Sequence, residues 1–135
     1  MSKIIKFTPI ILLLSLLVLV GCTLDSATSA KIQLSTTFFD LGEIDPNNGE
    51  VTNEFFIKNV GGSNLEIYSV STSCGCTQAK VDSNNIAPGE QTRLLVTYDP
   101  NVHQGFVGEI QRIVYIKSND PLQSELELEL RGVQK

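Results

Sequence analysis

Two cysteines separated by a single glycine are the residues of this sequence whose types and spacing could do chemistry. The chain has three cysteines, and Cys22 is assigned a separate role below, which leaves Cys74 and Cys76 as a pair. On an extended strand, residues two apart place their Cα atoms about 6.5 to 7 Å apart, at the limit of what a disulfide spans. Gly75 is expected to ease the tight turn that a bridge requires. A bridge in so small a ring would be strained and easily reduced, which suits a redox-active bond better than a structural one.

The same pair also suits a metal site or a purely structural role. Two thiolates on one face of a strand match the ligand preference of Cu(I), or of Zn²⁺ when further ligands are present. In the structural alternative both thiols pack at a strand end, where small residues ease a sharp exit. No other cofactor is predicted.

Short strands are the elements that must position these cysteines. Beyond residue 31 no stretch shows a sustained helical period, and turn signals recur between runs rich in Val, Ile, Phe, Thr and Tyr. In 124–131 three leucines alternate with three glutamates, which is typical of a strand with one buried face. The predicted strands are 32–39, 51–59, 65–71, 78–81, 92–98, 109–117 and 124–131. Their number and spacing predict an all-β, seven-stranded immunoglobulin-like Greek-key sandwich over residues 32–135.

The predicted topology brings the sole histidine to the cysteine pair. Loops of a Greek-key sandwich alternate between its two ends, so the first, third and fifth connections share one end. These connections carry Asp45-Pro46-Asn47-Asn48, Cys74-Gly75-Cys76 and His103. We therefore consider Cys74, Cys76 and His103 as candidate ligands for Cu(I) or Zn²⁺, with the alternative that the histidine is simply solvated.

Several short motifs follow one another in the predicted sandwich. They are Phe55-Phe56-Ile57-Lys58-Asn59-Val60-Gly61, Leu65-Glu66-Ile67, Ser73-Cys74-Gly75-Cys76-Thr77, Ala87-Pro88-Gly89-Glu90, Tyr98-Asp99-Pro100, Ser118-Asn119-Asp120-Pro121 and Leu130-Arg131-Gly132. Together they resemble a family of bacterial immunoglobulin-like domains of unknown function, related to the Hydin-like and major-sperm-protein-like sandwiches. The resemblance covers nearly all of residues 32–133. It implies the sandwich fold and export, often as a lipoprotein, and it supplies no catalytic residues.

The N-terminal segment resembles a bacterial lipoprotein signal peptide. Lys3 and Lys6 precede an apolar run of 11 residues, 10–20, which is too short to span a bilayer. Leu19-Val20-Gly21-Cys22 matches the lipobox, so residues 1–21 are the predicted signal and Cys22 the predicted lipidation site, acylated with palmitate-like chains. Residues 22–31 are then the lipidated cysteine and a flexible tether. Because Thr rather than Asp follows Cys22, a Gram-negative cell would place the protein in the outer membrane of its envelope.

Charge and motif content exclude several functions. Removing the signal leaves 8 basic and 15 acidic residues, a formal charge of 8 − 15 = −7, which argues against nucleic acid as a partner. The sequence has no phosphate loop, no His-Glu-x-x-His and no nucleophile elbow, and no small-molecule substrate is indicated. We therefore expect a non-enzymatic interaction or scaffolding lipoprotein that binds another envelope protein. The alternative is a metal-binding or thiol-redox accessory protein that uses the Cys-Gly-Cys loop.

Two tyrosines are candidates for an interaction patch. Several predicted strands carry apolar residues on both faces, so one face must point away from the core. If the third and sixth strands are neighbours, Tyr68 and Tyr115 lie together on an outer sheet face and can form a partner surface. Ordinary partial exposure of the two side chains is the alternative, because more than half of a typical protein surface is apolar.

Overall fold

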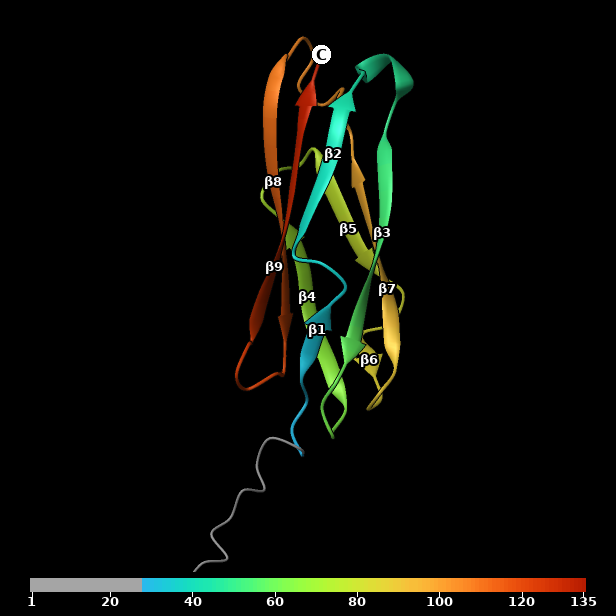
Figure 1. Cartoon of the computed structure of the whole chain (residues 1–135), viewed down its shortest axis with the longest axis vertical. Coiled ribbons are helices and arrows are strands. Elements are labelled where there is room, and N and C mark those ends of the chain that lie inside the picture. The colour runs from blue at the N-terminus through green and yellow to red at the C-terminus, as the bar shows by residue number, and fades with distance from the viewer. Residues whose placement is uncertain (1–27) are drawn as a thin grey trace, which may run out of the picture.

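The alternation of apolar and polar residues produces strands throughout residues 28–135, the part of the chain that the computed structural model describes (Figure 1). The strands are β1 Ile32–Leu34, β2 Phe38–Ile44, β3 Val51–Asn59, β4 Leu65–Thr72, β5 Thr77–Val81, β6 Asn85–Ile86, β7 Gln91–Tyr98, β8 Gly108–Ser118 and β9 Glu125–Gln134, with a 3-10 turn at Pro46–Asn48. Within these residues there is no α-helix and no helix able to cross a membrane.

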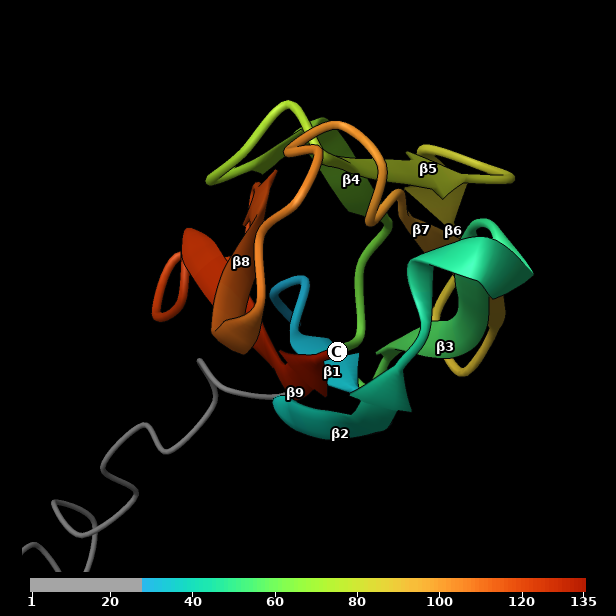
Figure 2. The same cartoon turned by 90° about the horizontal axis from the view of Figure 1, so that it is seen from above.

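Two sheets face each other and enclose the core, which confirms the predicted all-β sandwich (Figure 2). One sheet has four strands in the order β1-β3-β7-β5, and the other has five in the order β2-β9-β8-β4-β6. The described chain therefore has nine strands rather than the predicted seven. One of the two extra strands is the two-residue β6, which pairs with the start of β4.

The second extra strand arises because the predicted first strand changes sheets. β1 pairs antiparallel with β3, and β2 pairs parallel with β9 in the opposite sheet. Thr36 redirects the chain between them: its Oγ1 donates to the carbonyl of Phe38 at 2.6 Å and accepts from the Phe38 N–H at 3.2 Å. Such a hydroxyl turn replaces the ladder hydrogen bonds that a continuous strand would make.

Aliphatic side chains from both sheets make up the main core. Its fully buried members include Ile57, Leu65, Leu94, Val114 and Leu128, each 0% exposed. A smaller apolar cluster closes one end of the sandwich and contains Ile44, Cys76, Tyr98 and Ile110. Cys76 is thus part of the core at that end, and the half-buried Cys74 packs against it.

The chain enters the sandwich at the opposite end, where backbone hydrogen bonds hold it (Figure 1). The N–H groups of Val60 and Gly62 donate to the carbonyls of Lys31 and Ser29 at 2.9 and 3.0 Å. Gly61, between them, lies so close that a Cβ there would meet the Ser29 carbonyl oxygen at 2.2 Å. Residues 29–31 fall within the predicted tether. In the structure they belong to the folded domain, because their backbone carbonyls accept hydrogen bonds from the β3–β4 turn.

Asp120 anchors the same entry segment from the β8–β9 turn. The residue is 3% exposed, and its carboxylate accepts the N–H of Ile32 at 2.9 Å and those of Leu122 and Gln123 at 2.8 and 3.1 Å. Burial by itself raises the pKa of Asp120, but the three N–H donors and the nearby Lys31 charge outweigh it and hold the pKa below its ordinary value. The ionised carboxylate thus ties β1 to the β8–β9 turn.

Candidate functional site

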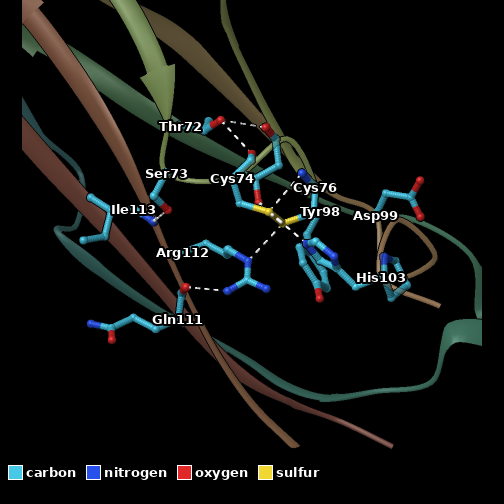
Figure 3. Close-up of a disulfide and its surroundings, with 12 residues drawn as sticks. Thr72, Ser73, Cys74, Cys76, Tyr98, Asp99, His103, Gln111, Arg112 and Ile113 are labelled. Atoms are coloured by element: carbon cyan, nitrogen blue, oxygen red, sulfur yellow. Dashed lines mark hydrogen bonds between the residues drawn. A yellow bond between two sulfur atoms is a disulfide. The ribbon is translucent and has the colours of Figure 1, made fainter. Parts of the chain in front are cut away.

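The site is built on a disulfide between Cys74 and Cys76, in the turn that joins β4 to β5 (Figure 3). The two Cα atoms are 5.1 Å apart, closer than an extended strand allows, because the N–H of Thr77 donates to the Cys74 carbonyl at 3.1 Å and closes a turn. Gly75 does not adopt a left-handed backbone conformation, and a Cβ there would meet nothing within 4 Å. The turn is expected to depend on glycine, but the structure shows no requirement for glycine at position 75.

Side chains on both sides fix the turn in place. The Oγ1 of Thr72 lies 3.0 Å from the Cys74 carbonyl and 2.8 Å from that of Thr77, so its hydrogen bridges the two ends of the turn. Ser73 is joined to β8 twice, by its own N–H to the Ile113 carbonyl and by its Oγ, which accepts the Ile113 N–H, both at 2.9 Å. The sulfur atoms are consequently held against β8.

Arg112 on β8 donates directly to the disulfide. Its Nε lies 3.0 Å from Cys76 Sγ, and its Nη1 donates to the Gln111 carbonyl at 2.7 Å. The guanidinium also stacks over the ring of Tyr98, 5.7 Å from the ring centroid. Tyr98 is fixed in turn, because its hydroxyl donates to the buried Gln134 side chain at 2.8 Å. A positive charge is thus aimed at one of the two sulfurs by a buried framework.

His103 contacts the other sulfur. Its Nε2 lies 3.5 Å from Cys74 Sγ, and the ligand atoms of Cys74, Cys76 and His103 all lie within 4.8 Å of one another (Figure 3). The β7–β8 loop that carries His103 is tied down by two bonds: Asn101 donates its Nδ2–H to the Pro46 carbonyl at 3.2 Å, and the Phe106 N–H donates to the His103 carbonyl at 3.1 Å. The three connections that carry these residues therefore meet at one end of the sandwich.

The two sulfurs differ in how exposed their residues are. Cys76 is 1% exposed and packs in the smaller apolar cluster, whereas Cys74 is half-buried at its edge. An incoming thiolate can therefore reach Cys74 more easily than Cys76. The arrangement provides an accessible sulfur to attack and a buried sulfur, next to a cation, that can leave as a thiolate.

The other predicted site residues lie elsewhere. Tyr68 is 62% exposed in an irregular stretch of β4, and Tyr115 is half-buried on the neighbouring strand β8. The register puts Tyr115 opposite Ser71, so the Ser69–Lys117 pair lies between the two tyrosines. The predicted signal 1–21 and Cys22 lie outside the described residues.

Arg112 is a candidate site residue that the sequence patterns do not single out. It stands 36 residues from Cys76, and no motif joins them. The pairing of β4 with β8 brings them together. Thr72, the last residue of β4, pairs with Val114, and Ser73 hydrogen-bonds Ile113, so Arg112 follows next to the Cys-Gly-Cys turn. Only knowledge of which residues pair between β4 and β8 would have predicted that Arg112 lies beside Cys76.

Fold and site define an all-β, immunoglobulin-like sandwich domain that carries a Cys-Gly-Cys disulfide at one end. The chain belongs to a family described as proteins of unknown function (DUF1573), whose model matches residues 32–133. This family membership confirms the expected resemblance to an immunoglobulin-like domain of unknown function. Among curated proteins, none matches the chain.

Solved structures agree on the fold. A protein of unknown function from Porphyromonas gingivalis W83 is 26% identical, with a TM-score of 0.71 over 82% of this chain and 50% of that one. The seventh PapD-like domain of human CEP192 is 9% identical, with a TM-score of 0.63 over 85% and 92% of the two chains. The YadV chaperone is 13% identical, with a TM-score of 0.52 over 77% and 51%. The chain thus spans half of the Porphyromonas protein, and the two more distant likenesses concern the fold alone.

Proposed function

We propose that this protein is a lipid-anchored accessory protein of the bacterial cell envelope whose sandwich carries a thiol–disulfide exchange site. The observation that carries the proposal is the contact of 3.0 Å between Arg112 Nε and Cys76 Sγ, beside a more exposed Cys74. The lipobox at 19–22 supports the anchoring, and export would bring the cysteines into an oxidising compartment.

The exchange begins with a dithiol of a partner protein. A partner thiolate attacks Cys74 Sγ, the bond between Cys74 and Cys76 breaks, and the electron pair leaves on Cys76 Sγ, where the Arg112 guanidinium stabilises the negative charge. The second partner thiol then attacks the partner sulfur of the mixed disulfide and releases Cys74. The partner has lost two electrons and two protons and now holds the disulfide, while Cys74 and Cys76 are a dithiol. Exchange with the disulfide of another envelope protein reverses these steps.

A single cysteine substitution should trap the mixed disulfide. In Cys76→Ser the internal disulfide cannot form, and Cys74 is a lone thiol. Its thiolate attacks the disulfide of an oxidised partner, one partner sulfur leaves as a thiolate, and the mixed disulfide stays because Cys76 is absent and cannot attack it. We expect conjugates on non-reducing gels of the envelope fraction that disappear with reductant, and far fewer conjugates with the matched variant Cys74→Ser, whose remaining sulfur is 1% exposed in the native fold. Adding Cys22→Ser should move the conjugates out of the membrane fraction.

Equal trapping by the two cysteine variants would contradict the assignment of Cys74 as the attacked sulfur. A native disulfide that stays intact in excess reduced glutathione, while the unfolded protein is reduced, would contradict exchange altogether. Conjugates that remain in the membrane fraction without Cys22 would count against the lipid anchor alone.

A non-enzymatic interaction module is the second candidate, and one observation favours it. The β7–β8 loop exposes three apolar side chains next to His103, Val102 at 49%, Phe106 at 40% and Val107 at 69%. Exposed apolar residues grouped on one loop are typical of a surface that contacts a protein. If the double variant Cys74→Ser/Cys76→Ser keeps a partner that Phe106→Ala loses, the interaction and not the exchange is the function.

A further inference from the structure

Three possible metal-binding atoms converge at the disulfide end, and residues 28–135 add no fourth to them. In residues 28–135 the cluster of possible metal ligands contains Cys74, Cys76 and His103, with all ligand atoms within 4.8 Å of one another. The carboxylate of Asp99, which follows β7 nearby, is outside this cluster and accepts the Asn101 N–H at 2.8 Å. The oxidised sulfurs cannot act as thiolate ligands, so the site exists only after the disulfide is reduced.

The geometry needs little adjustment to close around an ion. Metal bonds to nitrogen and sulfur of about 2.0 to 2.3 Å in a flat three-ligand site put the ligand atoms about 3.5 to 4 Å apart. Cys74 Sγ and His103 Nε2 are already 3.5 Å apart. The sulfurs need only separate from each other, and a Cα–Cα distance of 5.1 Å with side chains that rotate about Cα–Cβ permits it.

Ligand number and charge select the metal. Zn²⁺ in proteins is almost always held by four ligands, whereas a soft monovalent ion suits two thiolates and one imidazole. Two thiolates carry two negative charges, and Arg112 supplies one positive charge at 3.0 Å from Cys76 Sγ. One further positive charge makes the half-buried site neutral. A monovalent ion supplies that charge, whereas a divalent ion leaves the site with an excess positive charge.

We infer that the reduced protein binds one Cu(I) ion through Cys74 Sγ, Cys76 Sγ and His103 Nε2. The inference rests on the proposed exchange only in that it needs the reduced pair. Binding displaces to solvent every proton still bound to the two sulfurs and leaves the copper oxidation state unchanged. The same two sulfurs therefore alternate between a disulfide and a copper dithiolate. Bound copper blocks thiol–disulfide exchange at the pair, and exchange with the disulfide of another envelope protein, which takes up the two electrons, releases Cu(I).

A competition titration tests the site. The purified protein is reduced in denaturant, refolded without oxygen, checked for two free thiols in the 74–76 pair, and titrated with Cu(I) buffered by a chromophoric chelator. We expect one Cu(I) per chain and no binding by the oxidised protein. His103→Ala should weaken binding by at least the ~10-fold that loss of a ligand's supporting partner typically costs, and Cys74→Ser should abolish it. Asp99→Asn, which keeps the acceptor for Asn101, is the matched control and should bind as the unchanged protein does.

The outcomes separate the copper site from the exchange function. Two titrated thiols with no Cu(I) bound would overturn the copper site and leave exchange standing. Equal affinity in His103→Ala would overturn the three-ligand geometry. Zn²⁺ that displaces stoichiometric Cu(I) would overturn the choice of metal. A disulfide that resists glutathione in the native fold, together with tight Cu(I) binding after refolding, would overturn exchange and retain the copper site.

Discussion

Replacing Arg112 with glutamine removes a guanidinium N–H from Cys76 Sγ, 3.0 Å away, and with it the adjacent positive charge. In the reduced protein this N–H stabilises a thiolate, and a hydrogen bond to a charged group contributes about 1.5 to 3 kcal/mol. The same N–H stabilises the neutral sulfur of the disulfide less. Arg112→Gln therefore destabilises the reduced form more than the oxidised form. Because about 1.4 kcal/mol corresponds to about 30 mV for a two-electron couple, Arg112→Gln should lower the reduction potential by about 30 to 60 mV.

Equilibration in glutathione buffers of graded composition measures this shift. Thiols are trapped by acid and alkylated, and the reduced fraction is read by mass. Arg112→Lys is the matched control: it keeps the charge, loses the planar guanidinium donor, and should fall between the other two proteins. Because Arg112 also stacks on Tyr98, thermal unfolding of each variant checks that the fold is intact.

An unchanged potential in Arg112→Gln, with the fold intact, would refute the electrostatic role given to Arg112. A shift to a more positive potential would refute it as well, since it would mean that the guanidinium favours the disulfide. A shift of equal size in Arg112→Lys would show that hydrogen-bond geometry matters more than charge.

Two further predictions concern the end where the chain enters. Gly61→Ala should destabilise the domain by about 1 to 3 kcal/mol, because its Cβ would meet the backbone of residues 29–31 at 2.2 to 2.8 Å; Gly75→Ala, with nothing within 4 Å, is the matched control in denaturant unfolding and should be near neutral. In Asp120→Asn the free energy of unfolding should decrease less steeply as the pH is lowered into the acid range. Since the folded pKa of Asp120 is lowered, its contribution is complete above about pH 4 and is lost as the pH falls through the folded value, so an unchanged acid limb in the variant would contradict the role of the carboxylate.

The strands that alternate most clearly could be predicted from the sequence, and the sheet change could not. In β9 the buried leucines alternate with glutamates, so both its existence and its inward face follow from the pattern. Residues 32–39 contain no glycine or proline, so the sequence pattern predicts one continuous strand. In the structure the chain turns at Thr36. The Thr36 hydroxyl redirects the backbone without the glycine or proline that usually marks a turn in a sequence.

Parts of the site follow from topology alone, and others need the register. The alternation of loops between the two ends is enough to bring the β7–β8 loop to the cysteine pair, and His103 Nε2 lies 3.5 Å from Cys74 Sγ. The contact of Arg112 with Cys76 depends on which residue of β8 faces the end of β4, and a shift of one residue would turn its side chain to the other face. Asp120 likewise has the appearance of a turn residue until Ile32 is seen to donate to it.

The parallel pairing of β2 with β9 has a consequence for the order in which the domain can be completed. β2 is the second strand of the described residues to be synthesised, but its partner is the last of them. Until β9 arrives, β2 has no partner strand and β8 is paired only with β4. Ile44 then also lacks its register partner, the buried Gln134. Cys74 and Cys76 precede β9 in the chain, so under oxidising conditions their disulfide can close before β9 completes the sandwich.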